Sequence, residues 1–372
     1  SFHSHFLGTH RFQRAVVWKD VLIGIRHSEI ALLESSNYLL QSYVYGPNRA
    51  AGLRWAFRQS LRAGSDAYPG HFAGESLMQK IALILSLTLS LFLPATANPQ
   101  ADPTARSWNQ PVKPYRVIGN VWYVGASGVT SFLITTSNGH ILLDSGLPET
   151  VPQIRQNVAQ LGFELADIKI LINSHAHYDH AGGLAELKEL TGAKLMATEA
   201  DAELLARGGK DDFQWGDRYA YKPVKADRVL RDGDHVELGE VRLTARLTPG
   251  HTKGSTTWTM KVNEEGKQYD VVFSTSVSTP GYTLVNNEKY PGIVDDYRRT
   301  FQILKSLRCD VFLGPHAEFF SMKEKIARME RGVKPNPFID SAGYSEYVAG
   351  GESDFQKLVE TQTQEQKKKA GQ

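Results

Sequence analysis

The chain has almost no cysteine and no strong excess of either charge. Its 372 residues include a single cysteine, Cys309, which excludes a disulfide within the chain and a zinc site made of several thiolates. A metal site would therefore have to use histidine and carboxylate ligands. The formal net charge of +2 argues against a nucleic-acid partner. Internal repeats with periods of about 20 to 50 residues are also absent, which argues against solenoid and propeller folds.

Long apolar runs are scarce as well. Only residues 81–93 are apolar enough to suggest a membrane, and thirteen residues are too few to span a bilayer. The run follows Met78-Gln79-Lys80 and precedes Ala95-Thr96-Ala97. A short basic start, an apolar run and a small-residue exit are typical of a secretory signal peptide. Residues 78–97 are therefore expected to be a signal peptide cleaved after Ala97, with a buried core helix as the alternative.

Methionine is missing from the first 77 residues, because Met78 is the first in the chain. We expect residues 1–77 to be sequence translated from upstream of the true start, and the alternative is a genuine N-terminal domain. Residues 98–372 are expected to form a single domain in the periplasm of a Gram-negative host. This mature domain is expected to be a monomer without a membrane anchor.

The composition is that of a globular protein, with 41% hydrophobic and 22% charged residues. Its prolines make residues 98–115 an expected extended arm, and residues 208–224 are an expected loop. The apolar periodicity predicts antiparallel meanders over residues 117–143 and 228–273, further strands at 168–173, 194–197 and 310–313, and helices at 149–161, 184–190, 199–207 and 294–307. Two strand-rich halves, each followed by helices, predict an α/β fold of two sheets packed face to face with helices outside.

Histidine is concentrated in one short run, His175-Ala176-His177-Tyr178-Asp179-His180. The run follows an apolar strand, so its polar side chains are expected to project from a loop at the end of that strand. A divalent cation would satisfy several of these groups at once, whereas a solvated polar loop is the alternative. His251 and His316 also follow apolar strands beside Gly or Pro and are candidate ligands. His140, in a predicted strand, and His235, in a predicted turn, are interpreted as structural or surface residues.

These motifs carry a resemblance to a known family. The order HxHxDH, TPGHTxGSTTW and LGPHxxFF is similar to that of the metallo-β-lactamase superfamily, and the details resemble subclass B3 metallo-β-lactamases. The likeness extends from about Trp108 to Phe338 and includes the segments 209–213, 280–282, 296–298 and 335–338. The resemblance implies an αββα sandwich, with two mixed β-sheets flanked by helices and two zinc ions at the sheet edges.

The resemblance also implies a ligand set and a reaction. The first zinc would be bound by His175, His177 and His251, and the second by Asp179, His180 and His316. A zinc-bound hydroxide, oriented by Asp179, would attack the carbonyl carbon of a β-lactam ring, and the second zinc would stabilise the anionic nitrogen leaving group.

The substrate class depends on position 276. Thiolester- and lactone-cleaving relatives carry a metal-bridging Asp in this part of the chain, and subclass B1 enzymes carry a Cys ligand, whereas this chain has Ser276. The resemblance therefore favours hydrolysis of penicillins, cephalosporins and carbapenems, which confers antibiotic resistance. The alternatives are a thiolester or lactone hydrolase of the same fold, and a non-catalytic periplasmic zinc-binding protein.

Three further residues are candidates around the site. Family resemblance makes Ser276 and Ser278 the expected contacts for the substrate carboxylate, with ordinary strand-end hydroxyls as the alternative. Asp144 either braces the ligand loop or simply forms a turn. Cys309 stands where related enzymes have one half of a C-terminal disulfide, but residues 341–344 lack the partner, so the C-terminal helix is expected to be less tied down.

Overall fold

The computed structural model describes residues 103–371. The expectations for residues 1–77 and 78–97 lie outside this range, as do the first residues of the expected 98–372 domain. Between residues 103 and 371, no helix is both long and apolar enough to cross a bilayer.

Two β-sheets form the centre of the fold, and strands follow each other in space nearly as in sequence. The first sheet has seven strands in the order β1 to β7: Tyr115–Ile118, Val121–Tyr123, Phe132–Thr136, Gly139–Leu143, Ile168–Ile172, Lys194–Thr198 and Arg228–Leu230. The second has five strands in the order β12-β11-β10-β9-β8, where β8 to β12 are His235–Leu238, Val241–Leu247, Thr256–Glu264, Lys267–Phe273 and Val311–Leu313. Both sheets are mixed, because hairpins give antiparallel pairs and helical crossovers give the parallel pairs from β4 to β7 and between β11 and β12.

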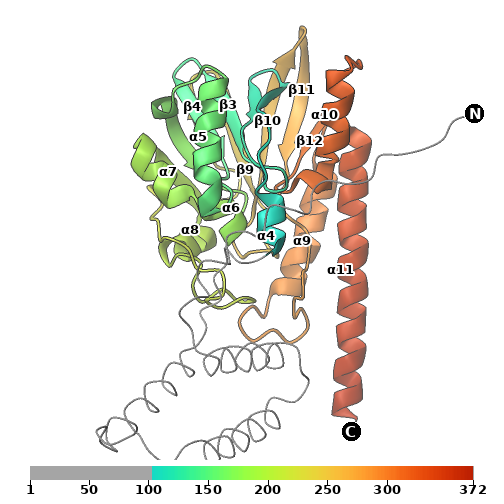
Figure 1. Ribbon diagram of the computed structural model, residues 1–372. Coiled ribbons are helices and arrows are strands. Elements are labelled where there is room, and N and C mark those ends of the chain that lie inside the picture. The colour runs from blue at the N-terminus through green and yellow to red at the C-terminus, as the bar shows by residue number, and fades with distance from the viewer. Residues whose placement is uncertain (1–102, 372) are drawn as a thin grey trace, which may run out of the picture. The chain divides into compact units, whose positions relative to one another are not determined.

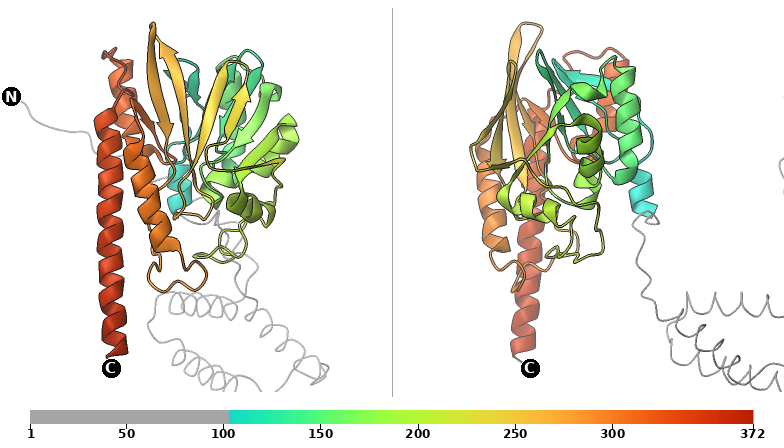
Figure 2. Two further views of the ribbon diagram at one scale, coloured as in Figure 1. Left: turned by 180° about the vertical axis from the view of Figure 1, so that it is seen from behind. Right: turned by 90° about the vertical axis from the view of Figure 1, so that its left-hand side faces the viewer.

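Helices cover the outer face of each sheet, as Figures 1 and 2 show. Along the first sheet lie α5, α7 and α8, at Val151–Gln160, Leu184–Thr191 and Glu199–Ala206, and along the second lie α9, α10 and α11, at Ile293–Ser306, Met322–Glu330 and Ser341–Ala370. Two short helices, α4 at Pro103–Trp108 and α6 at Tyr178–Ala181, and the 3-10 turns η2 at Pro148–Thr150, η3 at Leu165–Asp167 and η4 at Ala317–Phe320 complete the elements. The predicted αββα sandwich is confirmed.

The alternation of side chains along the first sheet builds two cores. In β3, Phe132 and Ile134 face the second sheet, while Leu133 between them belongs to the core beneath α5 and α7. Successive residues of a strand point to opposite faces, so a strand buried on both sides must be apolar throughout. This explains why the buried strand β5 reads Ile-Lys-Ile-Leu-Ile with only its lysine exposed.

Three local expectations were wrong. Residues 228–230 form β7, which pairs in parallel with β6 in the first sheet, so the predicted meander of residues 228–273 includes only β8 to β11 of the second sheet. Residues 103–108 form α4 rather than part of an extended arm. A proline is well tolerated in the first turn of a helix, where its missing N–H has no partner to lose, and Trp108 packs against the core of the first sheet. His235 begins β8 rather than lying in a turn, although its side chain is exposed as expected.

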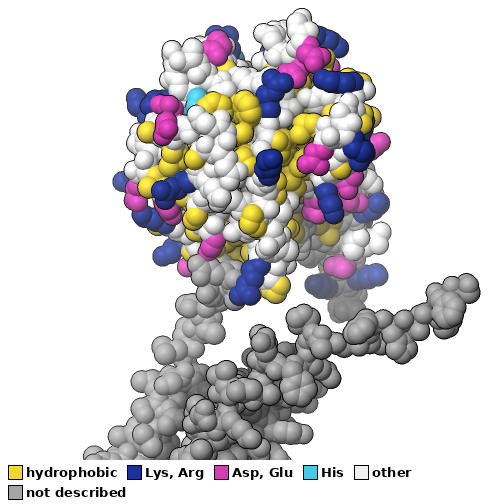
Figure 3. All heavy atoms as spheres, turned by 45° about the horizontal axis from the view of Figure 1, so that its top comes forward, with side chains coloured by type: hydrophobic (Ala, Val, Ile, Leu, Met, Phe, Trp, Pro, Cys, Tyr) yellow, Lys and Arg dark blue, Asp and Glu magenta, His cyan; other side chains and the backbone are white. Residues whose placement is uncertain are grey.

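Charged side chains of both signs share the surface. On the face drawn in Figure 3, lysines and arginines lie interspersed with aspartates and glutamates rather than forming a continuous basic strip.

Candidate metal centre

The histidine run begins in the turn after β5 and continues into α6, which contains Asp179 and His180. Asp144 fixes the turn through Ser174. The backbone N–H of Ser174 donates to Asp144 Oδ1 at 2.6 Å, and the Ser174 hydroxyl donates to Asp144 Oδ2 at 2.7 Å. Asp144 is 2% exposed and has a positive φ of 61°. Asp144 therefore forms a tight turn and also braces the ligand loop, so the two roles expected for it occur together.

Three imidazoles converge at a first group formed by His175, His177 and His251. His177 Nδ1 lies 3.2 Å from His251 Nε2, and the candidate ligand atoms of all three lie within 4.8 Å of one another. Hydrogen bonds to neighbouring groups hold the Nδ1 atoms of His175 and His251, so the Nε2 atom of each ring is the one that can serve as a metal ligand. Because the Ser174 hydroxyl hydrogen goes to Asp144, Ser174 Oγ accepts from His175 Nδ1 at 3.0 Å, and the Ser278 carbonyl accepts from His251 Nδ1 at 2.9 Å.

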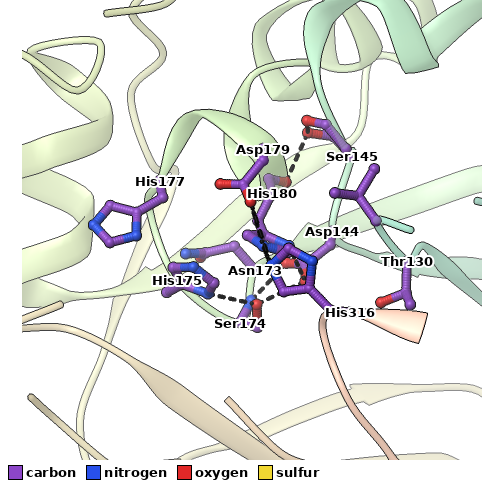
Figure 4. Close-up of polar contacts among 12 residues, drawn as sticks. Thr130, Asp144, Ser145, Asn173, Ser174, His175, His177, Asp179, His180 and His316 are labelled. Carbon is purple, nitrogen blue, oxygen red and sulfur yellow. Dashed lines mark hydrogen bonds and ion pairs between the residues drawn. The ribbon is translucent and has the colours of Figure 1, made fainter. Parts of the chain in front are cut away.

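A second group consists of Asp179, His180 and His316, which Figure 4 shows side by side. His180 Nε2 lies 3.2 Å from His316 Nε2, and Asp179 Oδ2 lies 3.1 Å from the former atom and 3.4 Å from the latter. His175 also comes within 4.8 Å of Asp179 and His180, so the two groups adjoin. The structure thus brings together all six ligands that the sequence nominated.

Charge and burial set the protonation of these groups. Burial lowers the pKa of His175 and of His251, and neighbouring imidazoles lower both further, so each ring is neutral and can offer a lone pair. Burial alone would raise the pKa of Asp179, but His180 and His316 hold it well below its usual value. Although burial opposes it, the carboxylates of Asp179 and Asp144 raise the pKa of His180 to about 10.

This donor set fits zinc. Two pairs of imidazole nitrogens face each other at 3.2 Å, and the Asp179 carboxylate lies beside one of the pairs. With the rings deprotonated, these atoms are closely packed, largely buried electron-pair donors that a divalent cation would satisfy together. Imidazole and carboxylate are ligands that zinc prefers, and three protein ligands in each group leave positions open, as in catalytic zinc sites. The outer nitrogens of His177 and His180 face Asp212 at 3.7 Å and Asp144 at 3.6 Å, so each has a carboxylate behind it.

A cavity of about 430 Å³ opens onto both groups. His177, Asp179, His251 and His316 line its floor, and its walls include Trp108, Trp215, Tyr219 and Phe319. Ser278 lines the cavity, whereas Ser276 does not; it is 2% exposed and its hydroxyl lies 2.9 Å from that of Ser278. Among the described residues that line the cavity there is neither lysine nor arginine.

The family model described as "Metallo-beta-lactamase superfamily" matches residues 124–316, which include all six candidate ligands. The chain belongs to the metallo-β-lactamase superfamily. Members of this superfamily are metallo-hydrolases, and the buried histidine groups give this chain the means to bind metal.

Solved structures confirm the resemblance to subclass B3. A metallo-β-lactamase from Cronobacter sakazakii shares 44% identity at a TM-score of 0.68, covering 70% of this chain and 99% of that one. The native FEZ-1 enzyme from Legionella gormanii shares 43% at 0.67, covering 68% and 98%. BJP-1, a subclass B3 enzyme from Bradyrhizobium japonicum, shares 42% at 0.65, covering 69% and 97%. The Cronobacter enzyme is described by a HARLDQ motif, whereas this chain has histidine at the third and sixth positions, His177 and His180.

Curated relatives match over shorter stretches and have other activities. The bovine acyl-coenzyme A thioesterase MBLAC2 is 26% identical over 160 residues, which are 36% of this chain and 54% of that protein. A hydroxyacylglutathione hydrolase from a Bradyrhizobium species is 33% identical over 129 residues, 34% and 41% of the respective lengths. The chain therefore spans about half or less of these relatives, and they do not specify its substrate.

Sequence reasoning missed two residues that support the metallo-β-lactamase site. Asp212 was part of a family-like segment, residues 209–213, but its role behind His177 was not foreseen. Nothing in the sequence marked Asp201 as a site residue, because it lies in the predicted helix that forms α8 and is one of several acidic residues there. Its 1% exposed carboxylate accepts from Asn173 Nδ2 at 3.1 Å and from Thr252 Oγ1 at 2.8 Å, which links the loop before His175 to the loop that carries His251.

Asp201 predicts a measurable pH dependence of stability. Burial without a cationic partner raises its pKa to about 6, against the hydrogen bond from Thr252. The native state therefore binds this proton more tightly than the unfolded chain, so the stabilisation exists at low pH and is lost as pH rises through about 6. We expect the stability of the wild type to fall relative to Asp201→Asn between about pH 4 and pH 7. Urea unfolding of both proteins with zinc removed measures this, and parallel pH profiles would contradict it.

Proposed function

We propose that this protein is a di-zinc β-lactamase of the subclass B3 type, which hydrolyses penicillins, cephalosporins and carbapenems and so confers antibiotic resistance. The observation that carries the proposal is Ser276 at the position where thiolester-cleaving relatives bridge two metals with a carboxylate. Its hydroxyl lies against that of Ser278, and among residues 103–371 the carboxylate paired with both His180 and His316 is that of Asp179. A metal held there by Asp179, His180 and His316 alone would have coordination positions left for a substrate atom.

The zinc ligands would be those that the geometry groups. His175, His177 and His251 would hold one zinc, and Asp179, His180 and His316 the other. Zinc bound there would supply Lewis acidity and an acidified water, and would stabilise negative charge on a departing amide nitrogen. That last contribution matters for a lactam, because an amide nitrogen leaves far less readily than a thiolate.

The chain's own side chains orient the reactants. Asp179 lines the cavity floor, where its carboxylate can accept a hydrogen bond from the attacking water and point a lone pair of that water at the lactam carbonyl carbon. Ser278 lines the same cavity, and its hydroxyl, which lies 2.9 Å from that of Ser276, would donate to the substrate carboxylate. Because no cationic side chain lines the described cavity, hydroxyl and ordered water contacts carry this recognition. Ser276 acts behind Ser278 in this scheme, because its own hydroxyl does not reach the cavity.

The aromatic walls exclude water and match apolar substituents. Trp108 comes within 4.8 Å of His316, and Phe319 within 5.1 Å, measured between ring centroids. A drier site strengthens hydrogen bonds to a substrate carboxylate and to developing charge.

Hydrolysis assays on the purified protein test the proposal. We expect benzylpenicillin, a cephalosporin and imipenem all to be cleaved, activity to be abolished by EDTA and restored by zinc, and clavulanate to have no effect because no serine nucleophile is acylated. Inhibition by clavulanate, or activity that survives chelation, would refute the zinc mechanism.

A hydrolase of thiolesters is the second candidate, supported by the curated relatives named above. A non-catalytic zinc-binding protein is the third candidate. Groups of three protein ligands are typical of catalytic zinc sites rather than of structural ones, which favours an enzyme. We further propose that cleavage after Ala97 yields a monomeric periplasmic enzyme without a membrane anchor, which intact-mass measurement of the exported protein would test.

A further inference from the structure

The segment of residues 275–285, here called the rim segment, connects substrate contact to metal ligation. It carries Ser278, whose carbonyl accepts from His251 Nδ1 at 2.9 Å. It also carries Tyr282, whose hydroxyl donates to the His251 carbonyl at 2.8 Å and whose ring stacks on the His251 ring with centroids 5.7 Å apart. Where this segment lies therefore determines how Ser278 and His251 are presented to the cavity.

The rim segment has no regular secondary structure that could hold it. Its backbone N–H and C=O groups therefore need partners outside a helix or a β-ladder. Gln214 provides one from the loop of residues 208–224, because its Nε2 donates to the Gly281 carbonyl at 2.8 Å. That contact is exposed to solvent, so it offers weak restraint by itself.

The Tyr297 hydroxyl of α9 donates to the Ser278 carbonyl at 2.7 Å, and the C-terminal helix α11 provides further partners. The Tyr347 hydroxyl donates to the Thr275 carbonyl at 3.0 Å and accepts from the Val277 N–H at 3.1 Å. Four turns further along the helix, Gln362 Oε1 accepts from the N–H groups of Leu284 and Val285 at 2.7 and 3.0 Å, and its Nε2 donates to the Tyr282 carbonyl at 2.7 Å. A glutamine suits this position because its amide offers an acceptor and donors together.

A glycine in α11 is further evidence that this helix packs closely against the rim segment. Gly351 is unfavourable within a helix, but a Cβ at this position would lie 2.4 Å from Val277 Cγ2. The helix therefore gives up intrinsic propensity in order to approach the rim segment closely.

The helix is itself firmly anchored, although Cys309 is free. Tyr344 donates to the Leu304 carbonyl at 2.8 Å, Lys325 pairs with Asp340 at 2.8 Å, and Phe355 stacks on Tyr297 with centroids 5.1 Å apart. Figures 1 and 2 show α11 running beside α9 and continuing beyond it. Packing and side-chain contacts thus replace the disulfide whose absence suggested a loosely held helix.

We propose that Gln362 is a positioning residue for substrate binding, acting through the rim segment. This inference rests on the proposed function for the identity of the substrate. Loss of the three Gln362 hydrogen bonds frees the backbone from Tyr282 to Val285. Ser278 is then positioned only by its own contacts, such as those from Tyr297 and His251, and loses the restraint that the rest of the segment gave it, while the six metal ligands keep their other supports. The effect falls on KM rather than on kcat.

The test compares Gln362→Ala with Gln364→Ala in the full chain. Gln364 is exposed on the same helix and serves as the matched control. In Gln362→Ala we expect faster amide hydrogen exchange at Leu284 and Val285, a KM for benzylpenicillin raised about three- to tenfold, kcat within about twofold of wild type, and unchanged zinc content. Gln362→Glu keeps an acceptor for Leu284 and Val285 but places a second carboxylate oxygen against the Tyr282 carbonyl, where Gln362 donates. It should therefore raise KM as well, although it has the size of glutamine. Gln364→Ala should match wild type throughout.

Several outcomes would overturn the inference. Unchanged exchange at Leu284 and Val285 would mean that Gln362 does not hold the rim segment. Faster exchange with unchanged KM would mean that the contact has no role in substrate binding, and loss of zinc would mean that it acts through His251 instead. If the wild type cleaves no β-lactam, the proposed function and the substrate role of Gln362 fail together, while faster exchange in Gln362→Ala would still establish the holding contact.

Discussion

Replacement of His251 by alanine is expected to lower kcat/KM for β-lactam hydrolysis by well over about 100-fold. Loss of a residue that merely supports a zinc ligand commonly costs about 10- to 100-fold, and loss of a ligand should cost more. His251 is the member of the first group that comes from the second sheet, through the loop after β9, so no neighbouring residue on the β5 loop can replace it. Steady-state kinetics at saturating zinc measures the effect.

His235 supplies the matched control for this prediction. It lies on the same sheet, at the start of β8, but is exposed and contacts Thr244 Oγ1 at 3.1 Å. His235→Ala should stay within about threefold of wild type, because surface substitutions away from special contacts change stability by less than about 0.5 kcal/mol. Equal losses in the two variants would contradict the assignment of His251 as a ligand.

His180→Ala has the second largest expected effect, which is on metal content. We expect elemental analysis to give two zinc ions per wild-type chain and about one per variant chain. Removal of this ring takes away a ligand whose Nε2 lies within 3.2 Å of both other members of the second group. Lactam hydrolysis should fall steeply with it, because the departing nitrogen loses its stabilising charge.

His140→Ala is the control for zinc content. His140 is also buried, at 7% exposed, but it lies in β4 against Phe163 and belongs to neither ligand group. It should keep both zinc ions even if it is less stable. A wild-type protein that binds a single zinc under zinc-replete conditions, with His180→Ala unchanged, would remove the second centre from the account.

Much of the site could be predicted from sequence because its ligands follow apolar strands. His175, His251 and His316 each come at the end of a strand, and those strand ends meet at one edge of the sandwich. The histidine run and the histidines after apolar strands marked the candidate residues, and the family resemblance supplied their division into two ligand groups. Ser278 was nominated from family resemblance and does line the cavity.

What sequence could not provide were contacts between distant segments. The link from Asp201 to Thr252 spans 51 positions, and that from Gln362 to Leu284 spans 78, and no local pattern marks either pair. The helix α4 was missed for a different reason. Its six residues are too few to show helical periodicity, and prolines nearby suggested extended backbone. Because Trp108 ends this helix, its place in the cavity wall was not predicted either.

The most direct test of the central claim is a comparison of kcat/KM for imipenem and for S-lactoylglutathione, measured on the same zinc-saturated preparation. Position 276 holds a serine, so an open second centre should favour cleavage of an amide over cleavage of a thiolester. We predict efficient imipenem hydrolysis, abolished by EDTA, with little or no thiolester cleavage. Robust S-lactoylglutathione hydrolysis without measurable imipenem hydrolysis would contradict the assignment and make the protein a thiolesterase of the same fold.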